Sequence, residues 1–181
     1  LLRELGSELV WPIAIATLSG PGMLLRESTD AVSPLALHRF AAGRRIGLLD
    51  TASGRAYLAC CGTTQREALL DVLATMPDAG TTGAFDRQSI RRELAAIRQR
   101  GHAVYRRPQR LSPQCAIAVP VMANGRVLAS LSIRYSDAAV RPALALQRFL
   151  SRLRGAATQI GRGFEKAAAS GAGRPGQRLG K

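Results

Sequence analysis

The chain is poor in aromatic residues, cysteine and acidic residues, and it has no long apolar run. Aromatic residues make up 4% of 181, so the core must be largely aliphatic and rich in alanine. Three cysteines in no zinc-binding spacing exclude a disulfide framework and favour free thiols in a reducing compartment. No segment has the length of a membrane span or the pattern of a signal peptide. We therefore expect a cytoplasmic protein with no membrane partner.

Positive charge is abundant. Lys and Arg number 26 against 12 Asp and Glu, which gives a formal net charge of +14. Only Lys166 and Lys181 are lysines, and every other cation is an arginine. Such a balance suits an anionic partner, either nucleic acid or small carboxylates. An arginine-rich composition inherited from a GC-rich genome explains the charge equally well, so the charge alone does not choose a partner.

Hydrophobic periodicity predicts an α+β fold. A chain of this length fits one domain with a tail. The predicted helices lie in residues 1–9, within 51–61, from Thr64 with a capping box, from Asp86 to Gly101 and from Pro142 onward. The predicted strands are residues 11–18, 23–28, 102–105, 114–121 and 127–135. Short connections, such as Asn124-Gly125, predict a mostly antiparallel sheet flanked by helices.

The two ends of the chain differ from its centre. The chain begins Leu1-Leu2-Arg3 without an initiator methionine, which suggests a fragment. We expect residues 1–10 to be the end of a linker helix from a missing amino-terminal domain and residues 11–166 to form the main domain. Residues 167–181 are rich in Gly and Ala, contain basic residues and no acid, and are predicted to be a disordered basic tail.

Catalytic and metal-binding patterns are missing. The two histidines, His38 and His102, fall in no metal-binding motif, and Thr51-Ala52-Ser53-Gly54 is not a nucleophile elbow. No glycine-rich phosphate loop and no pair of acids suited to proton transfer is evident. We expect no catalytic residue, no metal and no cofactor, and hence not an enzyme. A free-standing binding or enzymatic domain of similar α+β fold remains the alternative.

A cluster of arginines raises the question of direct nucleic-acid binding. Residues 87–110 contain eight arginines beside Asp86 and Glu93. The helix in this region is followed by a strand rather than by a recognition helix, and no aromatic residues are interleaved for base stacking. A solvated arginine face is the favoured interpretation.

Several motifs, in order, resemble the effector-binding domain of the IclR family of bacterial transcription regulators. The main one is Leu48-Leu49-Asp50-Thr51-Ala52-Ser53-Gly54-Arg55-Ala56-Tyr57-Leu58-Ala59. The others are Val10–Ala14, Arg26–Asp30, Ile97–Ala103, Ala116–Val121, Asn124-Gly125 and Leu128–Ile133. Together they cover roughly residues 1–165. The amino-terminal winged helix-turn-helix of the family is absent from this chain, and the end of the last strand, Arg134-Tyr135, departs from the family pattern.

The resemblance implies a GAF-like fold with a curved, mostly antiparallel sheet that holds a small organic acid. It also implies a homodimer or tetramer, whose geometry controls the binding of operator DNA by the missing winged helix-turn-helix. A ligand can shift such an equilibrium only by its differential affinity for the two arrangements. The expected function is therefore ligand sensing by a transcription regulator, with a small aromatic or short aliphatic carboxylic acid as effector.

Small residues in the main motif predict one wall of the ligand site. Ala52, Ser53 and Gly54 would let the first backbone amides of a helix approach a bound anion. Close packing of this helix on the sheet also requires small residues, so that interpretation stays open. By resemblance, Leu35 and Val119 are expected to supply apolar lining, whereas Arg55 is expected to be structural.

The last strand predicts the other wall. Alternation places Ser130, Ser132 and Arg134 on the face opposite Leu131 and Ile133. Simple amphipathicity, with the polar side in water, is the alternative. The neighbouring strand is apolar on both faces, which favours a covered site of a few polar groups in an apolar wall. Resemblance points to Ser132 and Arg134 as ligand contacts, and Arg134 could grip a carboxylate.

Overall fold

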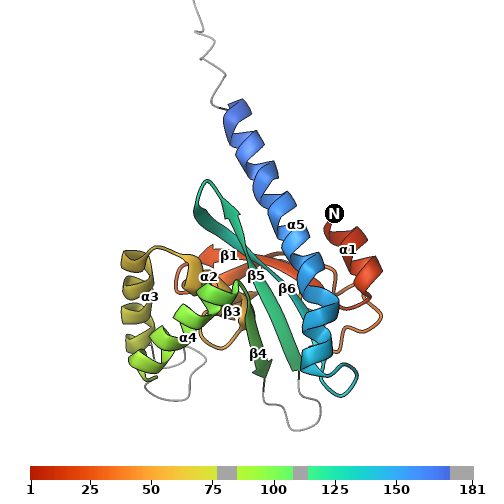
Figure 1. Ribbon diagram of the computed structural model, residues 1–181, viewed down its shortest axis with the longest axis horizontal. Helices are drawn as coiled ribbons and strands as arrows, with labels where there is room; N and C mark the ends of the chain where they lie inside the picture. Colours follow the sequence, from red (N-terminus) through yellow and green to blue (C-terminus); the bar gives the residue numbers. More distant parts are fainter. Residues whose placement is uncertain (77–84, 108–113, 172–181) are drawn as a thin grey trace, which may run out of the picture.

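A computed structural model describes residues 1–76, 85–107 and 114–171 of the chain. The elements run α1 (Leu2–Leu9), β1 (Ile13–Ser19), β2 (Gly22–Ser28), β3 (Arg45–Gly47), α2 (Ala52–Cys60), α3 (Thr63–Thr75), α4 (Arg87–Arg100), β4 (Ala103–Arg107), β5 (Gln114–Ala123), β6 (Arg126–Ser136) and α5 (Pro142–Gly171). Figure 1 shows one twisted sheet with helices on both sides, so the predicted α+β class is confirmed.

The sheet has six strands in the order β3-β2-β1-β6-β5-β4, and every neighbouring pair is antiparallel. The first and last strands of the chain, β1 and β6, thus lie side by side at the centre of the sheet, where Ala14 pairs with Ser132. The strand β3 was not predicted, because it has three residues and Ile46 is its only large apolar one. The other five strands match the predicted ones to within a few residues.

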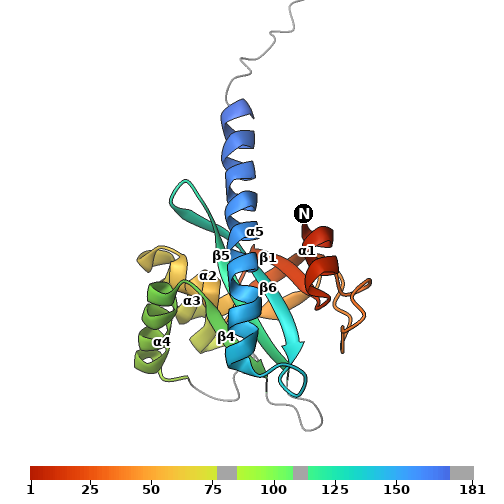
Figure 2. The ribbon, with the colours of Figure 1, turned by 45° about the vertical axis from the view of Figure 1, so that its right-hand side comes forward.

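Each face of the sheet has its own helical layer and its own core. The helices α2, α3 and α4 cover one face, and α1 with α5 cover the other (Figures 1 and 2). On the α5 face the strands contribute large residues, including Ile13, Ile117, Leu131 and Ile133. On the α2 face the central strands contribute mainly alanine and serine. The candidate site lies on this second face.

Turn and cap residues place several boundaries where the sequence predicts them. Asp86 is the N-cap of α4 and accepts hydrogen bonds from the amides of Gln88 and Ser89. Gly101 ends that helix in the left-handed region, at φ 72°. Asn124 and Gly125, at φ 48° and 72°, form the tight turn between β5 and β6.

Two predicted helix boundaries differ in the structure. The capping box expected at Thr64 is not formed, because α3 begins at Thr63 with Gly62 as its N-cap and has no side-chain cap. The helix α5 continues to Gly171, five residues beyond Lys166, the predicted end of the main domain. Its end is rich in alanine, which favours a helix without any packing. Residues 172–181 of that predicted tail lie outside the described part of the chain.

No helix in the described ranges is long and apolar enough to cross a membrane. In the same ranges, no three His, Cys, Asp or Glu side chains lie close enough to hold a metal ion.

Candidate ligand-binding site

A cavity lies between the amino-terminal end of α2 and the sheet. It offers about 70 Å³ to the centre of a water-sized sphere, and its wall is mostly apolar. All six strands, the first turn of α2 and the segment before β3 contribute to it. A site built from so many elements is positioned by the whole fold rather than by one loop.

The floor of the cavity is made by small residues of the central strands. Ala14 of β1, Ala116 of β5 and Ser132 of β6 all line it. Ala14 pairs with Ser132 across β1 and β6, and Ala116 pairs with Arg134 across β5 and β6. Because these side chains end at or just beyond Cβ, α2 can cover the sheet without filling the space above them.

The first turn of α2 forms the polar side of the cavity. Thr51 is the N-cap: its hydroxyl accepts from the Gly54 amide at 3.1 Å and donates to the Gly47 carbonyl at 2.6 Å. No acceptor in the described part of the chain takes the amides of Ala52 and Ser53. Unpartnered amides at a helix start, together with the helix dipole, favour an anion. Both residues line the cavity, as the sequence predicts.

Gly54 does not line the cavity. A Cβ added there would lie 2.4 Å from the Cα and the carbonyl oxygen of Leu48, so the missing side chain allows α2 to pack closely on the preceding segment. Its neighbour Arg55 has a bridging position: its Nε donates to the Leu49 carbonyl at 2.6 Å, and its guanidinium pairs with Glu93 of α4. Gly54 is therefore small because α2 packs closely at this position, which is the alternative left open by the sequence.

Arg134 reaches the cavity from β6 and is held by groups of the segment between β2 and β3. Its guanidinium forms an ion pair with Asp30 and lies over the Phe40 ring, 4.3 Å from the centroid. The Arg134 side chain is 15% exposed and that of Asp30 is 2% exposed. A hydrogen bond of 3.4 Å to the His38 carbonyl completes these contacts. Arg134 is therefore on the covered side of the sheet and not in open solvent.

Asp30 organises the segment that holds Arg134. Its carboxylate also accepts from the Phe40 amide at 2.5 Å and from the Ser28 hydroxyl at 2.6 Å. Arg44 lies on the Phe40 ring as well, 4.2 Å from the centroid. Phe40, which lines the cavity, is thus held by two guanidinium groups and by the carboxylate that neutralises one of them.

Several lining residues were not predicted from the sequence. Tyr105 and Arg107 of β4 and Gln114 of β5 line the cavity together with Phe40. The ring of Tyr105 lies under the Arg55 guanidinium, at 4.8 Å. Alternation along β4 could have identified Tyr105 and Arg107 as residues of the Ala103 face, but only once Ala103 was known to face α2.

Asp50 adds negative charge to the wall. Its Oδ1 atom is buried and has no hydrogen-bond partner in the described ranges, and a Cβ on Gly47 would lie 1.8 Å from it. The lining therefore contains the cations Arg107 and Arg134 and the anion Asp50, and Asp30 pairs with Arg134 from behind. These four formal charges sum to zero, so the helix amides have a large share in any preference for an anion.

Besides Gly54, three predicted site residues lie outside the cavity lining. Val119 is buried on the α5 face, because it pairs with Leu131 and paired residues share one face. Leu35 is 39% exposed at the surface. Ser130 is fully buried on the α2 face, and its hydroxyl has no partner in the described part of the chain. Of the eight predicted residues, Ala52, Ser53, Ser132 and Arg134 line the cavity and Leu35, Gly54, Val119 and Ser130 do not.

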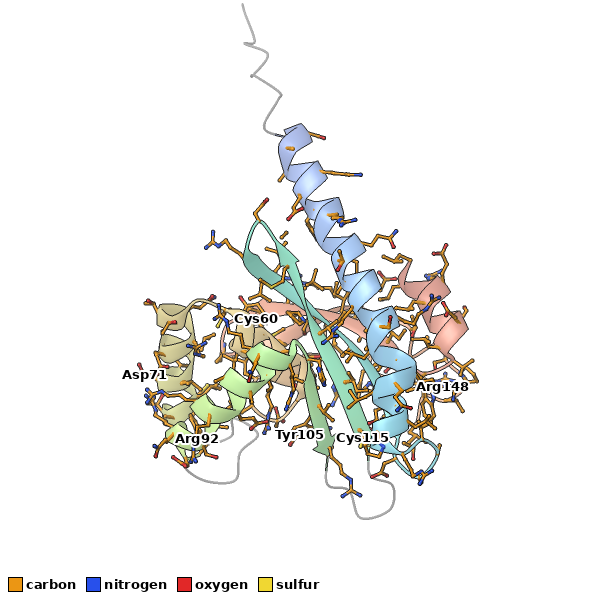
Figure 3. The ribbon with its side chains drawn as sticks, viewed as in Figure 1. Cys60, Asp71, Arg92, Tyr105, Cys115 and Arg148 are labelled. Carbon is orange, nitrogen blue, oxygen red and sulfur yellow. The ribbon has the colours of Figure 1, made fainter. Side chains whose placement is uncertain are left out.

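Burial favours the neutral forms of two groups, the thiol of Cys115 in the cavity lining and the imidazole of His102 just before β4. Burial raises the pKa of the Cys115 thiol, so little thiolate is present at neutral pH. Figure 3 shows Cys115 and Tyr105 on neighbouring strands at the same end of the sheet. Burial also lowers the pKa of His102, which accordingly carries little charge at neutral pH. The arrangement is suited to holding a small molecule by helix amides, a guanidinium and aromatic rings.

Comparison with known sequences gives a family. Residues 1–162 match the family model described as bacterial transcriptional regulator IclR C-terminal. A curated relative, named Probable transcriptional regulator SauR, from Cupriavidus necator, is 29% identical over 135 residues. The match covers 74% of this chain and 52% of SauR, so the chain spans about half the length of this relative.

Comparison with solved structures gives the same fold. The double mutant of the PobR inducer-binding domain from Acinetobacter, in complex with 3-hydroxybenzoic acid, has a TM-score of 0.71 at 21% identity, with 88% of this chain and 92% of that chain covered. An IclR homolog from Microbacterium hydrocarbonoxydans, complexed with 4-hydroxybenzoate, has a TM-score of 0.68 at 24% identity, with 89% and 63% covered. The family match and the shared fold together show that the chain belongs to the IclR family of bacterial transcriptional regulators, as an effector-binding C-terminal domain.

Proposed function

We propose that the cavity binds a small organic acid whose carboxylate lies between the first turn of α2 and Arg134. The observation that carries the proposal is that the amides of Ala52 and Ser53 and the guanidinium of Arg134 line one mostly apolar cavity. A guanidinium has five N–H donors, so Arg134 can bind Asp30 and a ligand carboxylate at once. Phe40 and Tyr105 would contact an aromatic or aliphatic remainder.

The relatives support an aromatic acid as the first ligand to test. The PobR domain and the Microbacterium homolog were solved with 3-hydroxybenzoic acid and 4-hydroxybenzoate, respectively. A hydroxyl group on the ring would suit this cavity, because the side-chain amide of Gln114, which can both donate and accept hydrogen bonds, lines it. Asp50 is a second possible acceptor for such a hydroxyl.

The function proposed for the whole protein follows the family. A winged helix-turn-helix amino-terminal to α1 would bind operator DNA, with α1 as the end of the connecting helix. Ligand binding would alter the geometry of a dimer or tetramer, and with it the spacing of two recognition helices. The protein would work in the cytoplasm.

Calorimetry on the purified chain tests the proposed site. We expect 3- or 4-hydroxybenzoate to bind and to be released unchanged after long incubation, whereas an enzymatic domain would convert it. Arg134→Ala should weaken binding by about 2–3 kcal/mol, the range for a charge-assisted contact. Ala116→Leu fills the floor of the cavity beside Arg134 and should abolish binding.

Arg26→Ala is the matched control, because Arg26 is an exposed arginine whose recorded hydrogen bond joins it to Thr17 of the neighbouring strand, away from the cavity lining. Its affinity for the acid should equal that of the parent. Unchanged binding in both Arg134→Ala and Ala116→Leu would place the ligand elsewhere. Light scattering on the same samples tests association: we expect at least a dimer at micromolar concentration, and a monomer would contradict the proposed quaternary arrangement.

A further inference from the structure

Four of the five basic residues of α5 follow one side of the helix; the fifth, Arg154, points away from them and donates to the Arg100 carbonyl. Arg148, Arg152, Arg162 and Lys166 are separated by 4, 10 and 4 positions, and at about 100° per residue they fall within roughly 80° of one another. All four side chains are exposed. We call these four residues the α5 basic stripe. From Arg148 to Lys166 the stripe extends over about 27 Å at the usual rise of an α-helix.

Little of this charge is neutralised. Arg152 pairs with Glu8 of α1, but no acid of the described ranges lies within 4.0 Å of Arg148, Arg162 or Lys166. The single acid of α5, Glu165, accepts from the Asn124 amide at 2.8 Å. On α4, in contrast, Arg87 and Arg91 pair with acids of α3. Arg162 and Lys166 in the distal half of α5 therefore have no acidic partner among the described residues, a property that Arg92 and Arg98 of α4 share.

The position of the stripe relates it to the start of the chain. The helix α1 runs antiparallel to α5, because Glu8 meets Arg152 while Leu1 lies in the same groove as Gln159. Figures 1 and 2 show the amino terminus beside α5, on the side toward which the end of α5 projects. Any segment that precedes Leu1 thus starts beside the turn of α5 that ends at Gln159, about one turn before Arg162.

We propose that Arg162 and Lys166 of the α5 basic stripe bind the phosphate backbone of DNA. The inference rests on the proposed function, in which the segment before α1 leads to a domain that reads the operator. Arginine and lysine on a rigid, solvated helix suit phosphates, and each neutralised phosphate releases counterions. The contact carries no sequence information: it adds affinity and favours one orientation of the domain on the duplex.

The purified 181-residue chain and a short fluorescent duplex of arbitrary sequence provide the test. The double variant Arg162→Gln/Lys166→Gln is compared with Arg92→Gln/Arg98→Gln, which removes the same charge from α4. Figure 3 shows Arg92 and the stripe residue Arg148 on opposite sides of the molecule. The parent should bind weakly. Loss of two phosphate contacts should lower the slope of log affinity against log salt by about 1.8, whereas the α4 variant should keep the parental slope.

Equal losses in both variants would reduce the effect to net charge and overturn the proposal. The same holds if Arg174→Gln/Arg178→Gln alone removes binding, or if the stripe variant loses binding to anionic phosphatidylglycerol vesicles and not to DNA. Hydroxybenzoate binding by each variant is measured in parallel. If the parent binds no acid but the stripe still determines DNA affinity, the proposed effector site fails and the DNA contact stands. If the parent binds the acid but the stripe variant keeps the parental DNA affinity and salt slope, the DNA contact fails and the effector site stands.

Discussion

The two faces of the central sheet are made by the same strands and differ in the size of their side chains. On the α5 face, Ile13, Leu131 and Ile133 are fully buried in a continuous apolar core. On the α2 face, the residues next to them in sequence are Ala14 and Ser132. A short side chain leaves space beneath the covering helix, and a long one fills it. Within the central strands, truncating a side chain should therefore cost more stability on the α5 face, whereas ligand binding depends on the α2 face.

The comparison predicts losses of different size for two adjacent residues of β6. Ile133→Ala should lower the free energy of unfolding by about 2–5 kcal/mol, because it opens a void in a close-packed core. Ser132→Ala should cost less than about 1 kcal/mol, since its hydroxyl makes one long hydrogen bond, 3.4 Å to the Ala14 carbonyl. Urea denaturation measures both. Similar losses for the two variants would contradict the assignment of stability to one face.

Two glycines extend the comparison to the covering helices. Gly54→Ala in α2 should destabilise the protein by about 1–3 kcal/mol, because the new Cβ would meet the Leu48 backbone at 2.4 Å. Gly155→Ala in α5 meets no atom within 4 Å and should stabilise the helix by about 0.5–1 kcal/mol. Thermal unfolding of both variants gives the signs directly. A stable Gly54→Ala protein would mean that α2 is not held closely against Leu48.

Alkaline pH gives a smaller effect that involves both faces. Burial raises the pKa of Cys60 and Cys61 on the α2 side and of Cys115 on the α5 side. In the unfolded chain these thiols ionise near 9.0, so above that pH the unfolded state binds fewer protons than the folded state. Stability should be intact below this pH and decline above it.

The free energy of unfolding, measured by urea denaturation at a series of pH values, checks this expectation. Cys115→Ala should flatten the decline. Tyr135, whose pKa burial also raises, adds a loss of the same sign at higher pH, so the decline should not vanish in that variant. A free energy of unfolding that stays constant or increases above pH 9.0 would show that the thiols are not buried as described.

Much of the fold could be predicted from hydrophobic patterns and from turn and cap residues. Apolar runs indicated β1 and β5, alternation indicated β6, and Asp86, Gly101 and Asn124-Gly125 indicated boundaries that the structure confirms. The prediction failed where the local signal was weak or ambiguous. The strand β3 has only three residues, and Thr64 has capping chemistry in a helix that begins one residue earlier.

The face that a site residue occupies was predictable where the pattern of its own strand was sufficient. It was not predictable where the pairing of two strands had to be known. Alternation along β6 separated Ser132 and Arg134 from Ile133 without any knowledge of its neighbours. The strand β5 is apolar on both faces, so only its pairing with β6 shows that Val119 lies on the α5 side. The ion pair between Asp30 and Arg134 joins residues 104 positions apart, and no pattern in the sequence signals it.

The attachment of α5 to the tip of the β5–β6 hairpin has a mechanical consequence. Gly161 lies so close to the Met122 carbonyl that a Cβ would be 2.0 Å from its oxygen, and Glu165 accepts from the Asn124 amide. The hairpin therefore acts as the pivot of a lever whose arm continues for about 15 Å beyond Gly161. A rotation of about 5° at the pivot would displace the end of α5 by about 1.3 Å for an arm of that length. Such a rotation would move Lys166 relative to the sheet while leaving the contacts of α5 with Met122 and Asn124 in place.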